Sequence, residues 1–190
     1  MKKFIALFLC FVLALVFVGC SNKDKSDSKN KNAHSVDVEY YAKIGKMPEH
    51  NYKLGSDAEK MKKDFEAEDQ KNAEDSEDGH THSVYSLIEG DEHDILIYKN
   101  AKYYYGQDGK VSMIVSLDDS YGFKVGDISK QIIDAVGETE EKKGDEETLF
   151  FLPMPETYTY AEYTFGENKV IFVFGENLLC ATAIYNPEKF

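Results

Sequence analysis

Three histidines in acidic surroundings are the side chains best suited to hold a metal ion. His80 and His82 stand two residues apart, and His93 follows Asp91 and Glu92. On an extended segment, side chains at this spacing point to the same side, so both imidazoles can reach one Zn²⁺ ion. A third ligand would come from a neighbouring hairpin arm. A solvated acidic loop with incidental histidines explains the same residues. We therefore predict no cofactor and keep zinc binding as an alternative.

Motifs for other kinds of chemistry are absent from the sequence. The acidic run at 66–78 lacks the glycine and glutamate positions of an EF-hand calcium loop, which favours a solvated loop. The chain has no Gly-x-Ser-x-Gly, no His-Glu-x-x-His and no phosphate-binding loop. Cys180 lies in an apolar, strand-like stretch, which is typical of a buried and unreactive thiol. We predict that the protein is not an enzyme.

The N-terminal residues 1–19 have the composition of an export signal. Two lysines precede an apolar run at 4–18, which is shorter than the roughly 20 residues of a spanning helix. Residues 16–20, Val-Phe-Val-Gly-Cys, resemble the lipobox that lipoprotein signal peptidase reads. This resemblance implies cleavage before Cys20 and a diacylglyceryl lipid on that cysteine. An ordinary secretory peptide or an uncleaved anchor is the alternative.

The lipid would hold the chain at the extracytoplasmic face of the cell membrane. Residues 20–35 are polar and read as a flexible tether, because they offer too little apolar surface to offset the entropy of ordering. All 22 basic residues are lysine, and tryptophan is absent, which suggests a low-GC, single-membrane bacterium. The formal net charge of −13 would repel nucleic acid, so no nucleic-acid partner is expected.

The rest of the chain carries an internal repeat. Residues 52–55 and 123–126 share the order aromatic, lysine, aliphatic, glycine. Each is followed by a potential helix cap, Ser56 or Asp127, and by an amphipathic helical pattern. Four short apolar runs then follow in each copy: 83–88, 94–99, 101–106 and 110–117 in the first, and 147–153, 158–165, 169–175 and 178–185 in the second. The run at 110–117 alternates with the period of a half-buried strand.

This order predicts an α+β fold built from two tandem repeats. The first repeat would span 36–119 and the second 120–190. In each, a short helical segment would pack on its own four-stranded antiparallel sheet, with a hydrophilic loop between the helix and the strands.

The helix-opening segment at 123–137 resembles a signature found in two related groups of proteins. One group is the small SmpA/OmlA-type envelope lipoproteins. The other is the beta-lactamase-inhibitor-protein-like (BLIP-like) family, whose tandem architecture this chain resembles more. The resemblance implies that the concave face of two adjacent sheets grips a partner protein. The disulfides of the secreted inhibitors have no counterpart here, and inhibition of a beta-lactamase does not carry over.

Tyrosines concentrate in the predicted strands and are the best candidates for partner-binding residues. Tyrosine offers rigid, amphipathic contact area and is enriched in protein interfaces. We select four of the thirteen tyrosines as partner contacts: Tyr98, Tyr104, Tyr158 and Tyr160. Filling of the hydrophobic core in a chain without tryptophan is the alternative role for the same rings.

Together these features predict a membrane-anchored, extracytoplasmic protein-binding module without catalytic activity. The partner is a protein of unknown identity. A zinc-binding envelope lipoprotein that uses the three histidines is one alternative. A structural envelope protein whose aromatic face pairs with itself is another.

Overall fold

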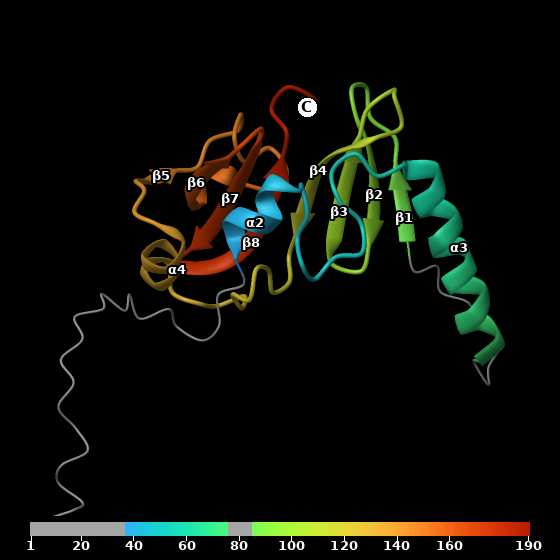
Figure 1. Ribbon diagram of the computed structural model, residues 1–190, viewed down its shortest axis with the longest axis horizontal. Coiled ribbons are helices and arrows are strands. Elements are labelled where there is room, and N and C mark those ends of the chain that lie inside the picture. Colours follow the sequence, from blue (N-terminus) through green and yellow to red (C-terminus); the bar gives the residue numbers. More distant parts are fainter. Residues whose placement is uncertain (1–36, 76–84) are drawn as a thin grey trace, which may run out of the picture. The chain divides into compact units, whose positions relative to one another are not determined.

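The computed structural model describes residues 37–75 and 85–190 (Figure 1). Cys20, the tether and two of the histidines, His80 and His82, lie outside these residues. None of the described helices is long and apolar enough to cross a membrane. The elements are α2 (Val38–Lys43), α3 (Ala58–Asp75), β1 (Tyr85–Ile88), β2 (Asp94–Tyr98), β3 (Ala101–Tyr105), β4 (Val111–Ser116), α4 (Ser129–Val136), β5 (Glu141–Lys143), a 3₁₀ turn (Pro155–Thr157), β6 (Thr159–Phe165), β7 (Asn168–Gly175) and β8 (Leu178–Tyr185).

All eight described strands belong to one antiparallel sheet with the order β1-β2-β3-β4-β8-β7-β6-β5. The prediction of two tandem repeats, each a helical segment on its own four-stranded sheet, is therefore wrong. The reason is the pairing of β4 with β8, in which Ile114 lies opposite Ile184 and Val115 opposite Ala183. This pairing satisfies backbone groups that two separate sheets would leave exposed at their edges, and it joins the two halves.

The strands begin and end close to the predicted runs, with one exception in the second half. The run at 147–153 is not a strand; β5 lies at Glu141–Lys143 instead. Helix α3 also continues to Asp75, through part of the stretch that we expected to be a hydrophilic loop. The apolar run that predicts a strand at 147–153 belongs to a loop, from which Leu149 and Phe151 enter the core.

The internal repeat corresponds to a turn that the two halves share. Gly55 and Gly126 both have positive φ, +81° and +96°, which glycine adopts without strain. The Gly55 N–H donates to Val111 O at the start of β4 (2.7 Å), and the Gly126 N–H donates to Leu179 O in β8 (2.8 Å). Each turn therefore attaches the chain ahead of a helix to the last strand of the same half.

The side chains predicted to cap the helices close these turns instead. Ser56 Oγ accepts a hydrogen bond from the Lys53 N–H at 3.0 Å, and Asp127 Oδ2 accepts one from the Lys124 N–H at 2.8 Å. The residue after Ser56 caps α3, because Asp57 Oδ1 accepts from the Lys60 N–H at 3.0 Å.

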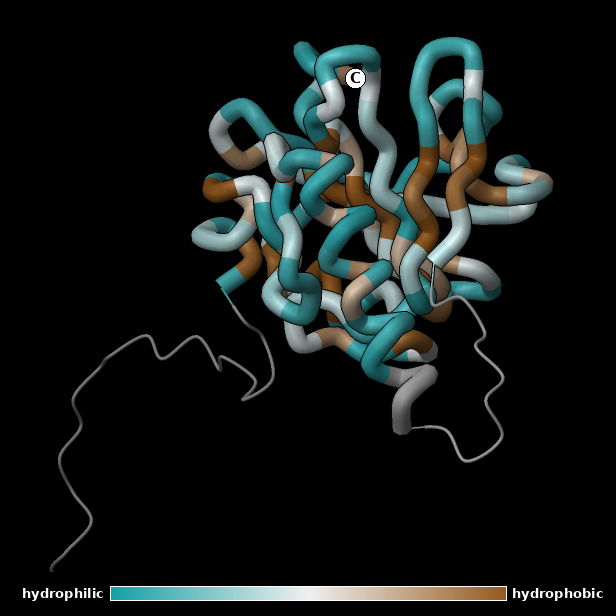
Figure 2. Tube along the Cα trace, turned by 90° about the vertical axis from the view of Figure 1, so that its right-hand side faces the viewer, coloured by the Kyte–Doolittle hydropathy of each residue, from teal (hydrophilic) through white to brown (hydrophobic). Residues whose placement is uncertain are grey.

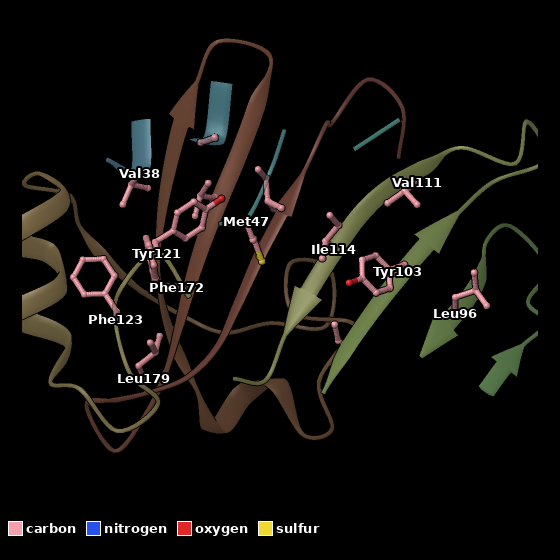
Figure 3. Packing of buried hydrophobic residues seen from close by; sticks show 14 of the residues in the cluster. Val38, Met47, Leu96, Tyr103, Val111, Ile114, Tyr121, Phe123, Phe172 and Leu179 are labelled. Atoms are coloured by element: carbon pink, nitrogen blue, oxygen red, sulfur yellow. The ribbon is translucent and has the colours of Figure 1, made fainter. Parts of the chain in front are cut away.

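Both faces of the sheet are apolar, and each supports a core. On the helix-covered face, buried side chains follow one another from Leu96 on β2 through Ile114 on β4 to Phe172 on β7 (Figure 3). The opposite face carries a second cluster that includes Tyr104, Met113, Val115, Leu149, Phe151, Tyr160, Ile171 and Val173. Figure 2 shows the apolar stretches along the strands and the hydrophilic residues in the connecting loops. Because the sheet is apolar on both sides, a second layer must cover the face that lacks helices.

The joint between β4 and β8 predicts how the chain unfolds. Ile114 is fully buried opposite Ile184, so Ile114→Ala leaves a cavity and should cost about 2–5 kcal/mol of unfolding free energy. Because both halves share this joint, thermal unfolding of the wild type and the variant should remain one cooperative transition. Calorimetry of the full chain tests this. Two separate transitions, with only one lowered by the substitution, would contradict a shared core.

Candidate functional site

The candidate site lies on the sheet face opposite the helices. The loop 144–158 and the C-terminal residues 186–190 lie on this face, and residues from both segments line a pocket together with the sheet. Its volume is about 310 Å³. It is lined by Met113 from β4, Glu162 from β6, Lys169 from β7, Tyr185 from β8, Glu147, Thr148 and Phe150 from the loop, and Phe190 from the C-terminal residues. We call it the aromatic pocket.

The loop 144–158 forms one wall of the pocket, and two buried side chains and a glycine fix its position. Leu149 and Phe151 enter the core, whereas Phe150 between them is 43% exposed. Asp145 Oδ1 accepts from the Thr148 N–H at 2.7 Å and fixes the turn before them. At Gly144 a Cβ atom would lie 2.2 Å from Pro155 O, so any larger residue would push the two ends of the loop apart. The loop therefore presents Phe150 between two buried side chains.

The C-terminal wall is positioned by Asn186 and by ring stacking. Asn186 is buried, and its N–H donates to Ser112 O at 3.2 Å, while its Oδ1 accepts from the Glu188 N–H at 3.0 Å. The Phe190 ring stacks on Phe150, with centroids 5.2 Å apart, and on His93 at 4.4 Å. These contacts place two partly exposed aromatic rings side by side at the mouth of the pocket, since Phe190 is 37% exposed.

The polar side of the pocket carries more negative than positive charge. Glu162 Oε1 lies 3.1 Å from Lys169 Nζ, and Glu162 Oε2 accepts from the Tyr185 hydroxyl at 3.4 Å. Burial is the larger cause and the nearby Glu162 carboxylate the smaller one, and together they raise the pKa of Tyr185 to about 12. This hydroxyl therefore stays protonated at neutral pH. Glu147 adds a second carboxylate at the rim. The pocket thus combines an apolar floor with hydrogen-bond acceptors and a net negative charge.

The four tyrosines selected from the sequence do not form one surface. Tyr98 lies under α3 on the helix-covered face, where it stacks on Phe65 at 4.1 Å and donates to Glu68. Tyr104 and Tyr160 are buried in the core of the opposite face, and Tyr158 packs partly buried against that core. Burial leaves Tyr104 and Tyr160 little surface for a partner. The alternating strand pattern cannot separate a covered face from an open one, because both faces of this sheet are apolar.

Sequence reasoning missed the residues that form the pocket mouth. Phe150 was placed in a strand that does not exist, and Phe190 follows the last predicted strand. The only local signal is the run Leu149-Phe150-Phe151-Leu152. Alternate residues of such a run can be buried on one face, so the two adjacent phenylalanines leave one ring for the surface. His93 contributes a stacked ring to this cluster.

The described residues offer no arrangement typical of a metal centre or a thiol nucleophile. No group of three or more His, Cys, Asp or Glu side chains within 37–71 and 85–190 is placed to hold a metal ion. Because His80 and His82 lie outside those ranges, zinc binding stays a prediction. Burial raises the pKa of the Cys180 thiol, which donates to Val173 O at 3.3 Å, and both effects disfavour the reactive thiolate.

A second, smaller cavity of about 160 Å³ is lined by His50 together with Tyr98 and Tyr103 of strands β2 and β3. His50 Nδ1 lies 3.4 Å from the Tyr103 hydroxyl. Its Nε2 is buried and has no hydrogen-bond partner within the described chain. Burial lowers the pKa of His50, although the carboxylates of Glu49 and Asp118 oppose this effect.

Comparison with known proteins assigns this chain to no family. No protein-family model matches the chain, and no curated protein matches it. Among solved structures, it is similar to a DUF4309 family protein (YjgB) from Bacillus subtilis subsp. subtilis str. 168. The two share 13% sequence identity over 79% of this chain and 93% of the other, with a TM-score of 0.47. A likeness at this level identifies no function.

The buried His50 predicts a pH dependence of stability. The unfolded chain binds a proton on His50 near pH 6.5, whereas the folded chain binds it only at lower pH. The unfolding free energy should therefore fall as the pH drops from 6.5 toward the pKa of His50 in the folded chain. Above pH 6.5 the contribution of the neutral His50 to stability should be complete. Urea unfolding of the full chain at pH 7.5 and 5.5 measures this loss.

The matched variant for this measurement is His50→Gln, which keeps a polar side chain but cannot titrate. It should show a smaller loss of unfolding free energy between the two pH values than the wild type. An equal loss in both proteins would show that other groups cause it.

Proposed function

We propose that this chain is a lipid-anchored, extracytoplasmic protein-binding module, without catalytic activity, that binds its partner through the aromatic pocket. The observation that carries the proposal is the stacked pair Phe150 and Phe190, which stays partly exposed at the mouth of a pocket with a net negative lining. Pockets that bind ligands have volumes of about 300 Å³ or more, so this pocket is large enough to take a side chain. Buried aromatic anchors contribute most of the binding energy in protein interfaces.

A protein partner explains the exposed rings better than a small ligand does. A ligand seated inside the pocket would leave the outer surfaces of Phe150 and Phe190 in water. A protein that inserts one side chain would also cover both rings and remove their apolar surface from solvent. The mouth of the pocket is thus arranged as an anchor site surrounded by apolar area.

The charge of the pocket selects for a basic partner segment. Glu147 and Glu162 face a single lysine, Lys169, and the whole chain has a formal charge of −13. A lysine or arginine of the partner can lay its apolar stem over Phe150 and direct its cation toward these carboxylates. Complementary charge would also speed the encounter and make it sensitive to salt.

Anchoring through Cys20 supports the same function. A tethered module on the outer face of a membrane stays close to membrane-bound partners, which raises their effective concentration. The resemblance of 123–137 to BLIP-like proteins, whose sheets grip a partner protein, agrees with this role. Self-association is the competing role, and its expected signature is a dimer that forms through the pocket mouth.

The anchoring part of the proposal predicts a change in fractionation. Cys20→Ser removes the sulfur that would carry the lipid, so the protein should move from the membrane fraction to the soluble extracytoplasmic fraction or remain as unprocessed precursor. Metabolic labelling with a palmitate analogue should mark the wild type alone. Equal labelling of both proteins would show that the lipid is not on Cys20.

The pocket part predicts selective loss of a partner. Phe150→Ala removes the exposed ring and keeps the buried side chains of Leu149 and Phe151, and it should reduce crosslinking to the partner in native envelopes about tenfold or more. The matched control is Met154→Ala, on the same loop and 65% exposed, which should retain full crosslinking. Raising the salt concentration should weaken the wild-type complex.

Three outcomes would contradict this assignment. If capture of the partner is unchanged by Phe150→Ala, or is lost equally with Met154→Ala, the pocket does not bind it. A crosslinked product that consists of this chain alone would favour the self-pairing structural role.

A further inference from the structure

A pocket of about 360 Å³ lies beside the start of α3 and shares no lining residue with the aromatic pocket. Three lysines line it: Lys46, Lys53 and Lys60. We call it the lysine pocket. Only two carboxylates, those of Asp57 and Asp64, line it as well. The chain has 35 acidic and 22 basic residues, so a pocket in which lysines outnumber carboxylates runs against its composition.

The backbone places two of these lysines directly opposite each other. Lys46 and Lys53 form an antiparallel bridge, and next to it the Leu54 N–H donates to Gly45 O at 2.8 Å. Residues opposite each other in such a pair direct their side chains to the same face, with Cβ atoms about 4.5–5.5 Å apart. The fully buried Tyr121 fixes the bridge, because its hydroxyl donates to Lys46 O at 3.2 Å. Two positive charges are thus held on one face.

The ammonium groups around the pocket have no acidic partner within the described chain. Six lysines there form ion pairs with carboxylates, and none of the six lines this pocket. Lys60, in the first turn of α3, donates its backbone N–H to Asp57, but its ammonium group forms no ion pair. Like charges placed opposite each other destabilise a fold. The described chain therefore leaves this repulsion without compensation.

The two carboxylates of the lining do not cancel the positive charge. Asp57 is engaged from outside the pocket by Lys110, whose Nζ lies 2.9 Å from its Oδ2. Asp64 accepts a hydrogen bond from the Tyr52 hydroxyl at 3.0 Å. Three ammonium groups therefore stand against one carboxylate that no lysine of the described chain pairs with. Charges farther than roughly 8 Å are largely screened at physiological salt, so these neighbours determine the local potential.

Uncharged donors complete the lining. Ser56 Oγ accepts from the Lys53 N–H at 3.0 Å, and its hydroxyl hydrogen has no acceptor among the described residues. Asn51 is exposed, and its side-chain amide forms no hydrogen bond with the described chain. A phosphate monoester carries about −1.5 to −2 charges at neutral pH and three acceptor oxygens, whereas a carboxylate has one charge and two oxygens. Several converging donors therefore match phosphate better than carboxylate.

We propose that the lysine pocket binds a phosphate group, either as the free ion or as the phosphate monoester of a lipid headgroup. The phosphate oxygens would accept from the three ammonium groups and from the Ser56 hydroxyl. Lysine suits this ligand as a point charge, without the planar fork of arginine, which the chain lacks. The site is separate from the proposed function, because no residue of the aromatic pocket takes part.

Calorimetry of the purified full chain in a non-ionic detergent tests the proposal. The probes are inorganic phosphate and glycerol 3-phosphate, the deacylated headgroup of phosphatidic acid, with acetate at matched ionic strength as the carboxylate control. At least one phosphate probe should give a saturable signal, and acetate should bind about tenfold more weakly or not at all. Binding of inorganic phosphate alone assigns the pocket to the free ion. Equal or tighter binding of glycerol 3-phosphate assigns it to a lipid headgroup.

Substitutions at exposed charges show where the phosphate binds. Lys53→Gln removes one of the two opposed ammonium groups and should weaken binding about tenfold or more. The matched control is Lys124→Gln, the same change at an exposed lysine outside the pocket, and it should stay within about twofold of the wild type. Asp64→Asn keeps an acceptor for the Tyr52 hydroxyl and removes a repelling charge, so it should tighten binding about twofold or more.

Folding of the variants is measured in parallel. Lys53→Gln should not lower the melting temperature, because it relieves a like-charge contact at an exposed residue. Phosphate should raise the melting temperature of the wild type, since a ligand that binds only the folded chain stabilises it.

Three results would overturn the proposal. The first is the absence of a saturable signal with either phosphate probe. The second is equal loss of binding with Lys53→Gln and Lys124→Gln, which would reflect net charge alone. The third is weaker binding by Asp64→Asn. Phe150→Ala should leave phosphate binding unchanged, so failure of this site and failure of the aromatic pocket are distinguishable.

Discussion

The pairing of β4 with β8 is the interaction on which the rest of the structure depends. The first half of the chain ends in β4 and the second half ends in β8, and each strand alone would be an open sheet edge. Their pairing gives both edges a hydrogen-bonded neighbour. The result is a single sheet whose central strands are buried on both faces. The turns at Gly55 and Gly126 then attach the chain ahead of α3 and α4 to these same two strands.

A sheet that is apolar on both faces needs cover on both, and the two covers differ. Helices cover one face, while a loop and the C-terminal residues cover the other. A helix satisfies its backbone hydrogen bonds internally, whereas the backbone of a loop needs other partners or water for its N–H and C=O groups. A loop therefore covers a sheet face less completely than a helix does. The aromatic pocket lies where this cover is incomplete, next to the stacked rings of Phe150 and Phe190. The candidate site thus follows from the way the sheet is joined.

Local patterns in the sequence predicted the elements but not their assembly. The alternation at 110–117 placed β4, and the apolar runs at 158–165, 169–175 and 178–185 placed β6 to β8, within a few residues of their positions. The contact between Ile114 and Ile184 is remote along the chain, and no local period encodes it. Leu149 and Phe151 enter the core from a loop with the same alternation as a strand. Tyr104 and Tyr160 were misjudged for a related reason, since the sequence does not show that the face without helices is covered.

Hydrogen exchange of the full chain tests the central claim most directly, namely that a protein partner binds over the aromatic pocket. The exchange of backbone amides would be compared between the protein in its native membranes and the same protein purified in detergent. We expect slower exchange in membranes at 147–152 and 186–190, with α4 unchanged, because a bound partner shields the pocket walls. Equal exchange at both walls in the two preparations, or protection confined to the helix-covered face, would contradict the account.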